Sequence, residues 1–206
     1  MEKKEIGLFF GTFNPIHNGH LMAATYALEH SYLDEIWFVV SPSAPFKEKR
    51  DALLPLEERV KMINMVTNSY NMRAIDDEKY LKEPTYSINT LNYLSEKYPN
   101  CEFTMIIGAD NYATIFTFYH HEEILANYKL IVLDRLGYKK EDLHVLYPKS
   151  TKEAIKNAKS ITFLDGSPSS NLSSTFIRNE IKNDKNIEFY VPFVVRDIIL
   201  TNKYYK

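Results

Sequence analysis

The chain lacks several features that define other classes of protein. Its 206 residues include a single cysteine, Cys101, which excludes an intrachain disulfide, and nothing indicates an oxidising compartment. No apolar run approaches the roughly 18 to 20 residues that a membrane span needs. The amino-terminal segment carries two lysines but only a short apolar run, without the longer apolar core of a secretory signal. We therefore expect a cytoplasmic protein with no membrane partner.

An excess of one charge is also missing. The chain has 25 lysines and arginines against 27 aspartates and glutamates, a formal net charge of −2. Proteins that bind nucleic acid usually present a basic face, so we expect small-molecule partners and no nucleic acid. No internal repeat, low-complexity tract or Ser/Gly linker divides the chain. With 45% hydrophobic residues it can bury one substantial core, which predicts a single domain over residues 1–206.

Short apolar, β-branched or aromatic runs alternate with segments of helical periodicity. We expect strands at residues 6–10, 35–40, 102–107, 129–133 and 160–164. Strands that alternate with helices are typical of right-handed βαβ units. The pattern predicts an α/β fold with a Rossmann-like, doubly wound parallel sheet, helices on both faces and a small helical part at the carboxyl end. Ligands of such sheets bind beyond the carboxyl ends of the strands.

The helices are expected in the segments between and after these strands. One begins at Pro55 and is expected to place Val60, Ile63 and Val66 on its buried face. Residues 137–157 are rich in lysine and only weakly periodic, which predicts a solvated helical connection. The other helices are expected at residues 21–28, at residues 87–98, after Gly108 and at residues 191–200.

The decapeptide GTFNPIHNGH, residues 11–20, lies between the first expected strand and a helix. Glycine-containing turns at this place bind phosphates, because backbone N–H groups and the positive end of the helix dipole converge there. His17 and His20 can face the same small volume if the helix begins at Asn18 or Gly19. Either histidine alone would be assigned to a helix cap or to the core, whereas the pair favours a phosphate site. Zinc is disfavoured because no other set of residues has convincing ligand spacing.

A second polar cluster lies near the carboxyl end of the chain. Ser173, Ser174 and Thr175 open an apolar-periodic helix, and Arg178 follows one turn later. Helix capping accounts for one of these hydroxyls, at about 1 kcal/mol. Capping does not require Arg178, whose guanidinium could reach an anion held at the helix N-terminus.

With GTFNPIHNGH near one end and SSTFIR near the other, the chain resembles the HxGH nucleotidyltransferases, and within them the bacterial nicotinate-nucleotide adenylyltransferases. Three more segments match the family in order: SPSAPFK at residues 41–47, EPTYSINTL at 83–91 and IGAD at 107–110. The resemblance covers almost the whole chain. The chain departs from the family where it has Phe118-Tyr119 in place of a tryptophan beside a tyrosine, and Arg135-Leu136-Gly137 in place of Arg-Pro-Gly.

The resemblance implies an enzyme that transfers AMP from ATP to nicotinate mononucleotide, giving nicotinate adenine dinucleotide and pyrophosphate in NAD biosynthesis. The attacking phosphate is already an anion, so catalysis needs positioning and charge stabilisation and no general base. The implied catalytic residues are His17, His20, Lys47 and Arg178, with the histidines charged beside the phosphates. The implied ATP-binding residues are Gly11, Thr12, Phe13, Gly108, Asp110, Ser174 and Thr175.

The same resemblance implies a pyridine-nucleotide pocket formed by Thr85, Tyr86, Phe118 and Arg135. Backbone amides at the start of the helix after Thr85 would favour a carboxylate over a neutral carboxamide. Mg²⁺ is expected with ATP, held mainly by phosphate oxygens and water, because dedicated protein cages for this ion are uncommon. The sequence does not determine the oligomeric state, and a homodimer is left open.

Other interpretations stay open at the level of sequence. The chain could be a sibling transferase that uses nicotinamide mononucleotide, phosphopantetheine or a cytidylyl acceptor, or a nucleotide-binding regulator without turnover. Length argues against the shorter siblings, and a regulator is expected to have lost part of the catalytic set. Among single residues, Lys47 could be a solvated loop charge and Asp110 a helix cap, while Tyr86 and Phe118 could be core aromatics.

Overall fold

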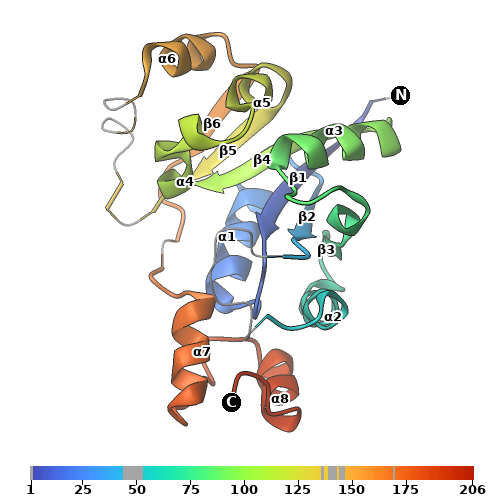
Figure 1. The fold of residues 1–206 in the computed structure, drawn as a ribbon, viewed down its shortest axis with the longest axis vertical. Coiled ribbons are helices and arrows are strands. Elements are labelled where there is room, and N and C mark those ends of the chain that lie inside the picture. The colour runs from blue at the N-terminus through green and yellow to red at the C-terminus, as the bar shows by residue number, and fades with distance from the viewer. Residues whose placement is uncertain (1, 44–52, 136, 139–142, 144–146, 169) are drawn as a thin grey trace.

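The computed structural model places a six-stranded parallel sheet at the centre of the molecule (Figure 1). The structure describes residues 2–43, 53–135, 137–138, 143, 147–168 and 170–206. The strands follow the order β3-β2-β1-β4-β5-β6, as predicted for a Rossmann-like fold. Their bounds are β1 (Lys4–Gly11), β2 (Glu35–Val40), β3 (Met72–Ile75), β4 (Cys101–Gly108), β5 (Lys129–Leu133) and β6 (Ser160–Leu164).

The sequence predicted each of these strands except β3. That strand has four residues, one of which is the exposed Arg73, so its apolar pattern is too short to stand out. It forms because the edge of β2 is available for pairing, with Ile36 beside Met72 and Val39 beside Ile75. Tertiary pairing rather than local sequence therefore determines the edge of the sheet.

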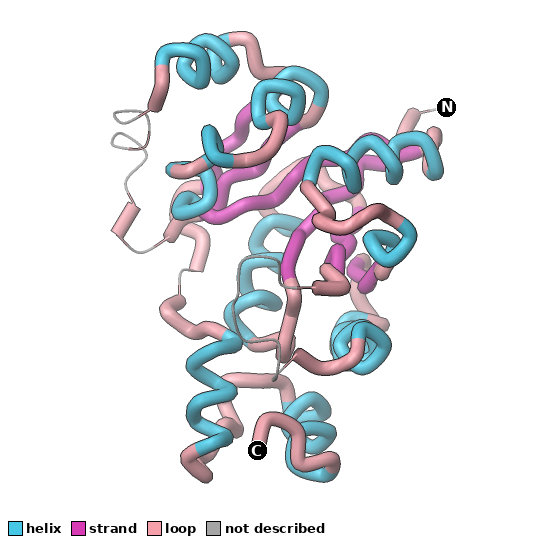
Figure 2. The backbone as a smooth tube through the Cα atoms, in the orientation of Figure 1, coloured by secondary structure: helices cyan, strands magenta, loops and turns pink. Residues whose placement is uncertain are grey.

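Helices cover both faces of the sheet, and Figure 2 shows the strands enclosed between them. The core on one face contains side chains of α1 (Asn18–Glu29), α2 (Leu56–Thr67), α7 (Ser174–Lys182) and α8 (Phe193–Thr201). The core on the other face contains side chains of α3 (Ser87–Lys97), α4 (Ala109–Ala113), α5 (His121–Asn127) and α6 (Lys149–Lys156). Two short 3₁₀ helices, η2 (Asp77–Tyr80) and η3 (Ile115–Thr117), complete the described helices.

Successive residues of the inner strands enter opposite cores. In β4, Ile106 belongs to the core that includes side chains of α1 and α2, whereas Ile107 belongs to the core that includes side chains of α3 and α5. A strand that is buried on both faces has no polar side to alternate with, which explains the uninterrupted apolar residues Met105–Ile107 of β4. None of the described helices is long and apolar enough to span a membrane.

The buried face of α2 differs from the predicted one. Ile63 is buried as expected, but Val60 and Val66 are only partly buried, and the fully buried positions include Arg59 and Met62. Hydrophobic periodicity cannot foresee this rotation, because it assigns a charged residue to the solvent face. The burial of Arg59 depends on hydrogen-bond acceptors from other segments of the chain.

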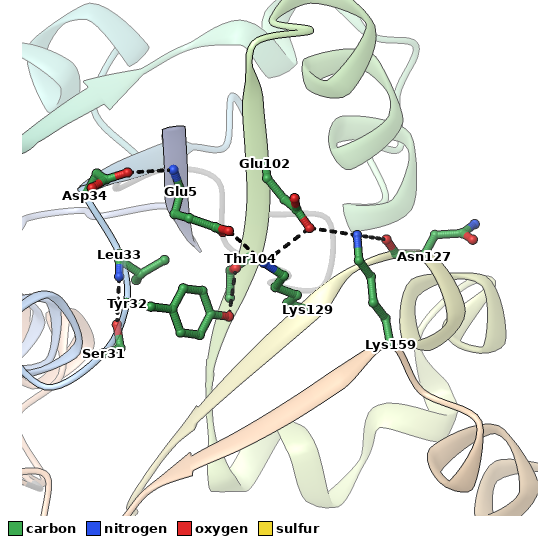
Figure 3. Close-up of polar contacts among 10 residues, drawn as sticks. All are labelled: Glu5, Ser31, Tyr32, Leu33, Asp34, Glu102, Thr104, Asn127, Lys129 and Lys159. Carbon is green, nitrogen blue, oxygen red and sulfur yellow. Dashed lines mark hydrogen bonds and ion pairs between the residues drawn. The ribbon is translucent and has the colours of Figure 1, made fainter. Parts of the chain in front are cut away.

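An ionic network joins the first residues of three neighbouring strands (Figure 3). The Lys129 Nζ atom lies 2.7 Å from Glu5 Oε1 and 3.2 Å from Glu102 Oε1. Lys159 Nζ lies 2.9 Å from the same Glu102 oxygen. The network connects the starts of β1, β4 and β5, so it supports the sheet at the edge opposite to the carboxyl ends of the strands.

Candidate active site

The carboxyl ends of β1, β4 and β5 open into a cleft of about 540 Å³. It lies where the strand order reverses between β1 and β4, the place at which doubly wound sheets bind ligands. The cleft brings together residues from both ends of the chain. The sequence-predicted residues that line it are Gly11, Thr12, Phe13, His17, His20, Gly108, Asp110, Arg135, Ser174 and Thr175.

The remaining predicted residues lie elsewhere. Arg178 is outside the lining but adjoins it, since its guanidinium donates to the Thr175 hydroxyl at 3.2 Å and to the Asn14 carbonyl at 2.7 Å. Lys47 lies outside the described residues. The pyridine-pocket candidates around the start of α3, Thr85, Tyr86 and Phe118, are not part of this lining.

Two glycines keep the strand ends open. A Cβ atom at Gly11 would lie 3.0 Å from the Phe13 ring, and one at Gly108 would collide with the Asp110 carboxylate. Side chains at these positions would therefore displace groups that line the cleft. Glycine is needed at these two positions because the side chains of Phe13 and Asp110 lie too close to the backbone to leave room for a Cβ atom.

The two histidines share one volume, as predicted. Helix α1 begins at Asn18 with His17 as its N-cap, and the Nδ1 atom of His17 accepts a hydrogen bond from the His20 backbone N–H at 3.3 Å. The imidazole rings stack with centroids 3.6 Å apart and planes at 19°. Gly19 permits this approach, because a Cβ atom there would lie 3.1 Å from His17 Nδ1.

The surroundings keep both imidazoles neutral in the free protein. Burial, followed by the charge of Arg135, lowers the pKa of His17 to about 4. Burial, followed by the neighbouring His17 and Arg135, lowers the pKa of His20 well below its usual value. The buried Nδ1 atom of His20 has no hydrogen-bond partner among the described residues. The charged forms expected from the sequence thus require an anion in the cleft, which would raise both pKa values.

Arg135 and Asp110 lie beside each other in the lining of the cleft. The Arg135 Nε atom lies 3.5 Å from Asp110 Oδ2, and its Nη1 atom donates to the Ser170 carbonyl at 3.3 Å. Both side chains are partly exposed, so the pair is screened by solvent. The charge of Arg135 also acts on the two histidines, whose pKa values it lowers in addition to the larger effect of burial.

Two of the helix N-termini at the cleft, those of α1 and α7, carry no acidic side chain that would neutralise their dipoles, whereas the first turn of α4 contains Asp110. The first turns of α1 and α7 contain no acidic residue, whereas those of α2 and α5 contain two each. Ser173 caps α7 by accepting the Phe176 N–H at 3.1 Å, and Ser174 donates to the Pro15 carbonyl at 2.9 Å. The α7 terminus is thereby tied to the 11–20 loop, and the two positive ends form a site suited to anions.

A buried carboxylate that the sequence did not indicate supports the start of α3. Glu78 is 3% exposed and accepts hydrogen bonds from the Thr85 hydroxyl at 3.3 Å and the Thr90 hydroxyl at 2.8 Å. Burial raises the pKa of Glu78. Its position in a polar segment, DDEKY, resembles a solvated turn, so no local signal could have found it.

The aromatic partner of Tyr86 is Tyr119. Their rings stack with centroids 4.4 Å apart, and Tyr119 is 49% exposed, whereas Phe118 packs partly buried against the core. Sequence reasoning chose Phe118 from this adjacent pair, because nothing local distinguishes two neighbouring rings. Helix α3 begins beside Tyr86 with no side-chain cap and no acid in its first turn, which leaves its N-terminal amides available.

Comparison with known proteins gives a consistent set of relatives. The cytidylyltransferase-like family model matches residues 8–180. The chain is 39% identical over 202 residues to a protein of Cytophaga hutchinsonii named probable nicotinate-nucleotide adenylyltransferase, and covers 98% of each chain. A protein of the same name from Flavobacterium johnsoniae is 39% identical over 203 residues, with 98% of this chain and 99% of that one covered.

Solved structures show the same fold. A nicotinic acid mononucleotide adenylyltransferase of Plasmodium falciparum, determined in complexes with APC and with NaAD, superimposes with a TM-score of 0.75 at 19% identity. The match covers 98% of this chain and 97% of that one. At this identity the likeness establishes the arrangement of the sheet and helices.

Proposed function

This chain belongs to the cytidylyltransferase-like family, among the nicotinate-nucleotide adenylyltransferases, and on that premise we propose that its cleft transfers AMP from ATP to nicotinate mononucleotide. The products are nicotinate adenine dinucleotide and pyrophosphate. The observation that carries the proposal is the convergence of the 11–20 loop and the α7 N-terminus on one cleft at the switch point of the sheet. A phosphate oxygen of nicotinate mononucleotide forms the new bond to the α-phosphorus, and the bond to pyrophosphate breaks.

His17 and His20 act as donors to the phosphates of ATP. A neutral imidazole offers one N–H, and an imidazolium offers two, so the second donor appears only when the phosphates raise the pKa. Backbone amides of Thr12 and Phe13, together with those at the start of α7, complete an electrostatic site that stabilises charge on the transferring and leaving groups. No carboxylate base is needed in this scheme, because the nucleophile is already ionised.

Arg178 and Lys47 serve the leaving phosphates. The hydrogen bonds of Arg178 to Thr175 and to the Asn14 carbonyl hold its guanidinium beside the α7 N-terminus, where an anion would bind. Lys47 is assigned to the same task through the family segment in which it lies. Arg135, beside Asp110, contributes positive charge between the phosphates and the acceptor nucleotide.

The nicotinate carboxylate binds at the start of α3. The free N-terminal amides of that helix and the absence of acid in its first turn suit a carboxylate better than a carboxamide. Glu78 holds the Thr85 hydroxyl in place beneath this position. Tyr86 and the neighbouring aromatic pair, Phe118 and Tyr119, provide surfaces on which a pyridine ring can stack.

Magnesium enters as part of the substrate, bound to ATP. The described residues contain no group of three or more histidine, cysteine, aspartate or glutamate side chains that could hold a metal ion. Phosphate oxygens and water would supply most of its ligands, as is usual for Mg²⁺ bound to a nucleotide. The same proposal includes a single nucleotidyltransferase domain over residues 1–206, which limited proteolysis tests. It also includes a cytoplasmic location, which cell fractionation tests, and a homodimer, which the mass in solution tests.

The first prediction concerns the acceptor. Purified protein with Mg-ATP should release pyrophosphate much faster with nicotinate mononucleotide than with nicotinamide mononucleotide, because only the acid presents a carboxylate to the amides of α3. Equal rates with the two nucleotides would contradict the acid preference and favour a sibling transferase. Absence of turnover with either nucleotide would contradict the enzyme assignment.

The second prediction concerns His20. In the same pyrophosphate assay, His20→Ala should lower turnover by about a hundredfold, the order expected for the loss of one preorganised donor.

A further inference from the structure

Arg59 is an arginine that the reaction scheme above does not use, yet it is fully buried behind the cleft. Its side chain is 0% exposed, on the inner face of α2. Burial lowers the pKa of Arg59 to about 10, which leaves the guanidinium charged at neutral pH. No carboxylate forms an ion pair with it among the residues that the structure describes. A buried charge normally requires such a partner, so its surroundings must stabilise it in another way.

Backbone carbonyls take the place of the carboxylate. The Nη1 atom of Arg59 donates to the Thr12 and Ser41 carbonyls, both at 2.7 Å. Its Nε atom donates to the Leu54 carbonyl at 2.9 Å, and Nη2 donates to the Pro42 carbonyl at 3.3 Å. One planar group thus joins three segments: the loop after β1, the end of β2 and the residues before α2.

The bond to Thr12 has a geometric consequence at the cleft. A trans peptide unit is planar, and its C=O and N–H groups point in opposite directions. Because the Thr12 carbonyl points toward the buried guanidinium, the Phe13 N–H of the same peptide points away from it. Thr12 and Phe13 both line the cleft, so this N–H is directed to the side where a nucleotide would bind.

The backbone at Phe13 has an unusual conformation that needs such support. Its φ angle is 46°, in the left-handed region that bulky residues rarely adopt. The Phe13 ring is held in the core against His20 and Phe38, with centroid distances of 5.0 and 5.3 Å. The ring contacts and the Arg59 bond together determine how the loop presents its amide.

We propose that Arg59 is a positioning residue for adenylyl transfer: by holding the Thr12 carbonyl in the core, it directs the Phe13 N–H toward a phosphate of ATP. The proposal rests on the proposed function of this cleft. Arg59 does not touch the nucleotide, and its buried charge adds to the positive potential behind the loop. A purely structural role would predict lower stability with unchanged ATP recognition.

The test compares Arg59→Lys with Arg73→Lys, the same exchange at an exposed arginine on β3. Lysine keeps the charge but cannot reach several carbonyls from one planar group. In the pyrophosphate assay, Arg59→Lys should raise the KM for ATP by about 10-fold to 100-fold, the effect of one charge-assisted hydrogen bond, and change the KM for nicotinate mononucleotide less than twofold. Arg73→Lys should leave both unchanged. An ATP KM within twofold of the wild-type value in folded Arg59→Lys would overturn the proposal.

A measurement on the wild-type protein covers the case in which Arg59→Lys fails to fold. Addition of α,β-methylene-ATP with Mg²⁺ should shift the NMR resonance of the Phe13 amide and slow its hydrogen exchange. If both stay unchanged while the analogue binds, the proposed role of Arg59 is wrong and the adenylyltransferase assignment stands. If the wild-type protein neither binds the analogue nor releases pyrophosphate, the proposed function fails, and the role of Arg59 fails with it.

Discussion

At the scale of single residues, the chemistry of the histidine pair depends on the surroundings of the two rings. The pKa of His17 is about 4 in the free protein, because the ring is buried at the start of α1 and faces the charge of Arg135. The same residue would titrate near 6.5 in an unfolded chain. Folding therefore favours neutral imidazoles, and an anion that binds beside the rings would reverse this preference.

This difference predicts how stability depends on pH. The unfolded chain binds a proton at His17 below about pH 6.5, whereas the folded protein does not until about pH 4, so the free energy of unfolding should decrease as the pH falls through this window. His17→Asn keeps a good helix N-cap and removes the titration, so its free energy of unfolding should fall less steeply. Urea unfolding at several pH values between 4 and 7 measures both slopes. Identical slopes in the two proteins would rule out the lowered pKa of His17.

At the scale of elements, the start of α7 connects the carboxyl-terminal part of the chain to the 11–20 loop. Ser173 caps the helix, while Ser174 reaches the Pro15 carbonyl of the 11–20 loop. The two adjacent serines therefore have different roles: Ser173 stabilises the start of its own helix, and Ser174 joins that helix to another segment of the chain. Capping was one of the alternatives that the sequence left open for this cluster, and it is confirmed for Ser173 alone.

The local task of Ser173 can be measured. Ser173→Ala should lower the free energy of unfolding by about 1 kcal/mol, because the Phe176 N–H loses its acceptor. Ser173→Gly should lower it by only a few tenths of a kcal/mol, since glycine is a tolerable N-cap. Chemical denaturation with a common m-value compares the two variants. Equal losses for alanine and glycine would show that the capping bond contributes little to the stability of α7.

At the scale of the whole molecule, the carboxyl end of the chain closes onto its first loop. The Tyr205 hydroxyl donates to Asn14 Oδ1 at 2.7 Å, and the same oxygen accepts the Leu54 N–H at 3.2 Å. The Asn14 carbonyl accepts from Arg178. Helices α7 and α8 lie together beside the carboxyl terminus, at the end of the molecule away from α5 and α6 (Figure 1). The 11–20 loop is thus supported by the carboxyl-terminal part of the chain and by the residues before α2.

Removal of one hydroxyl tests this closure. Tyr205→Phe should lower the free energy of unfolding by about 1 kcal/mol, since Asn14 keeps its bond from Leu54 but loses the buried phenol donor. The matched change Tyr204→Phe, at the more exposed neighbouring tyrosine, should have a smaller effect. Thermal and urea unfolding give the comparison. A larger loss for Tyr204→Phe would show that the carboxyl end does not act through Asn14.

Much of the fold, and many of the residues that line the cleft, could be predicted from the sequence. Strong apolar runs marked β1, β2, β4, β5 and β6, and strand–helix alternation indicated the parallel sheet. The two end motifs supplied the residues of the cleft, because glycine turns and helix N-termini bind anions by local geometry. The structure confirms that His17 and His20 stack at the start of one helix, as their spacing required.

Local sequence by itself determined these features, because hydrophobic periodicity, turn formation and helix capping each depend on residues that are only a few positions apart in the chain. Only the tertiary structure decided the strand β3, the burial of Arg59 and Glu78, and the pairing of Tyr86 with Tyr119 instead of Phe118. It also decided that the imidazoles are neutral without a ligand. Each of these depends on partners that are distant in the chain. Strand β3 needs the free edge of β2, the burial of Arg59 needs carbonyls from three segments, and the neutral imidazoles need a buried site. The sequence identifies a titratable side chain, but its burial and its neighbouring charges, which determine its pKa, exist only after the chain has folded.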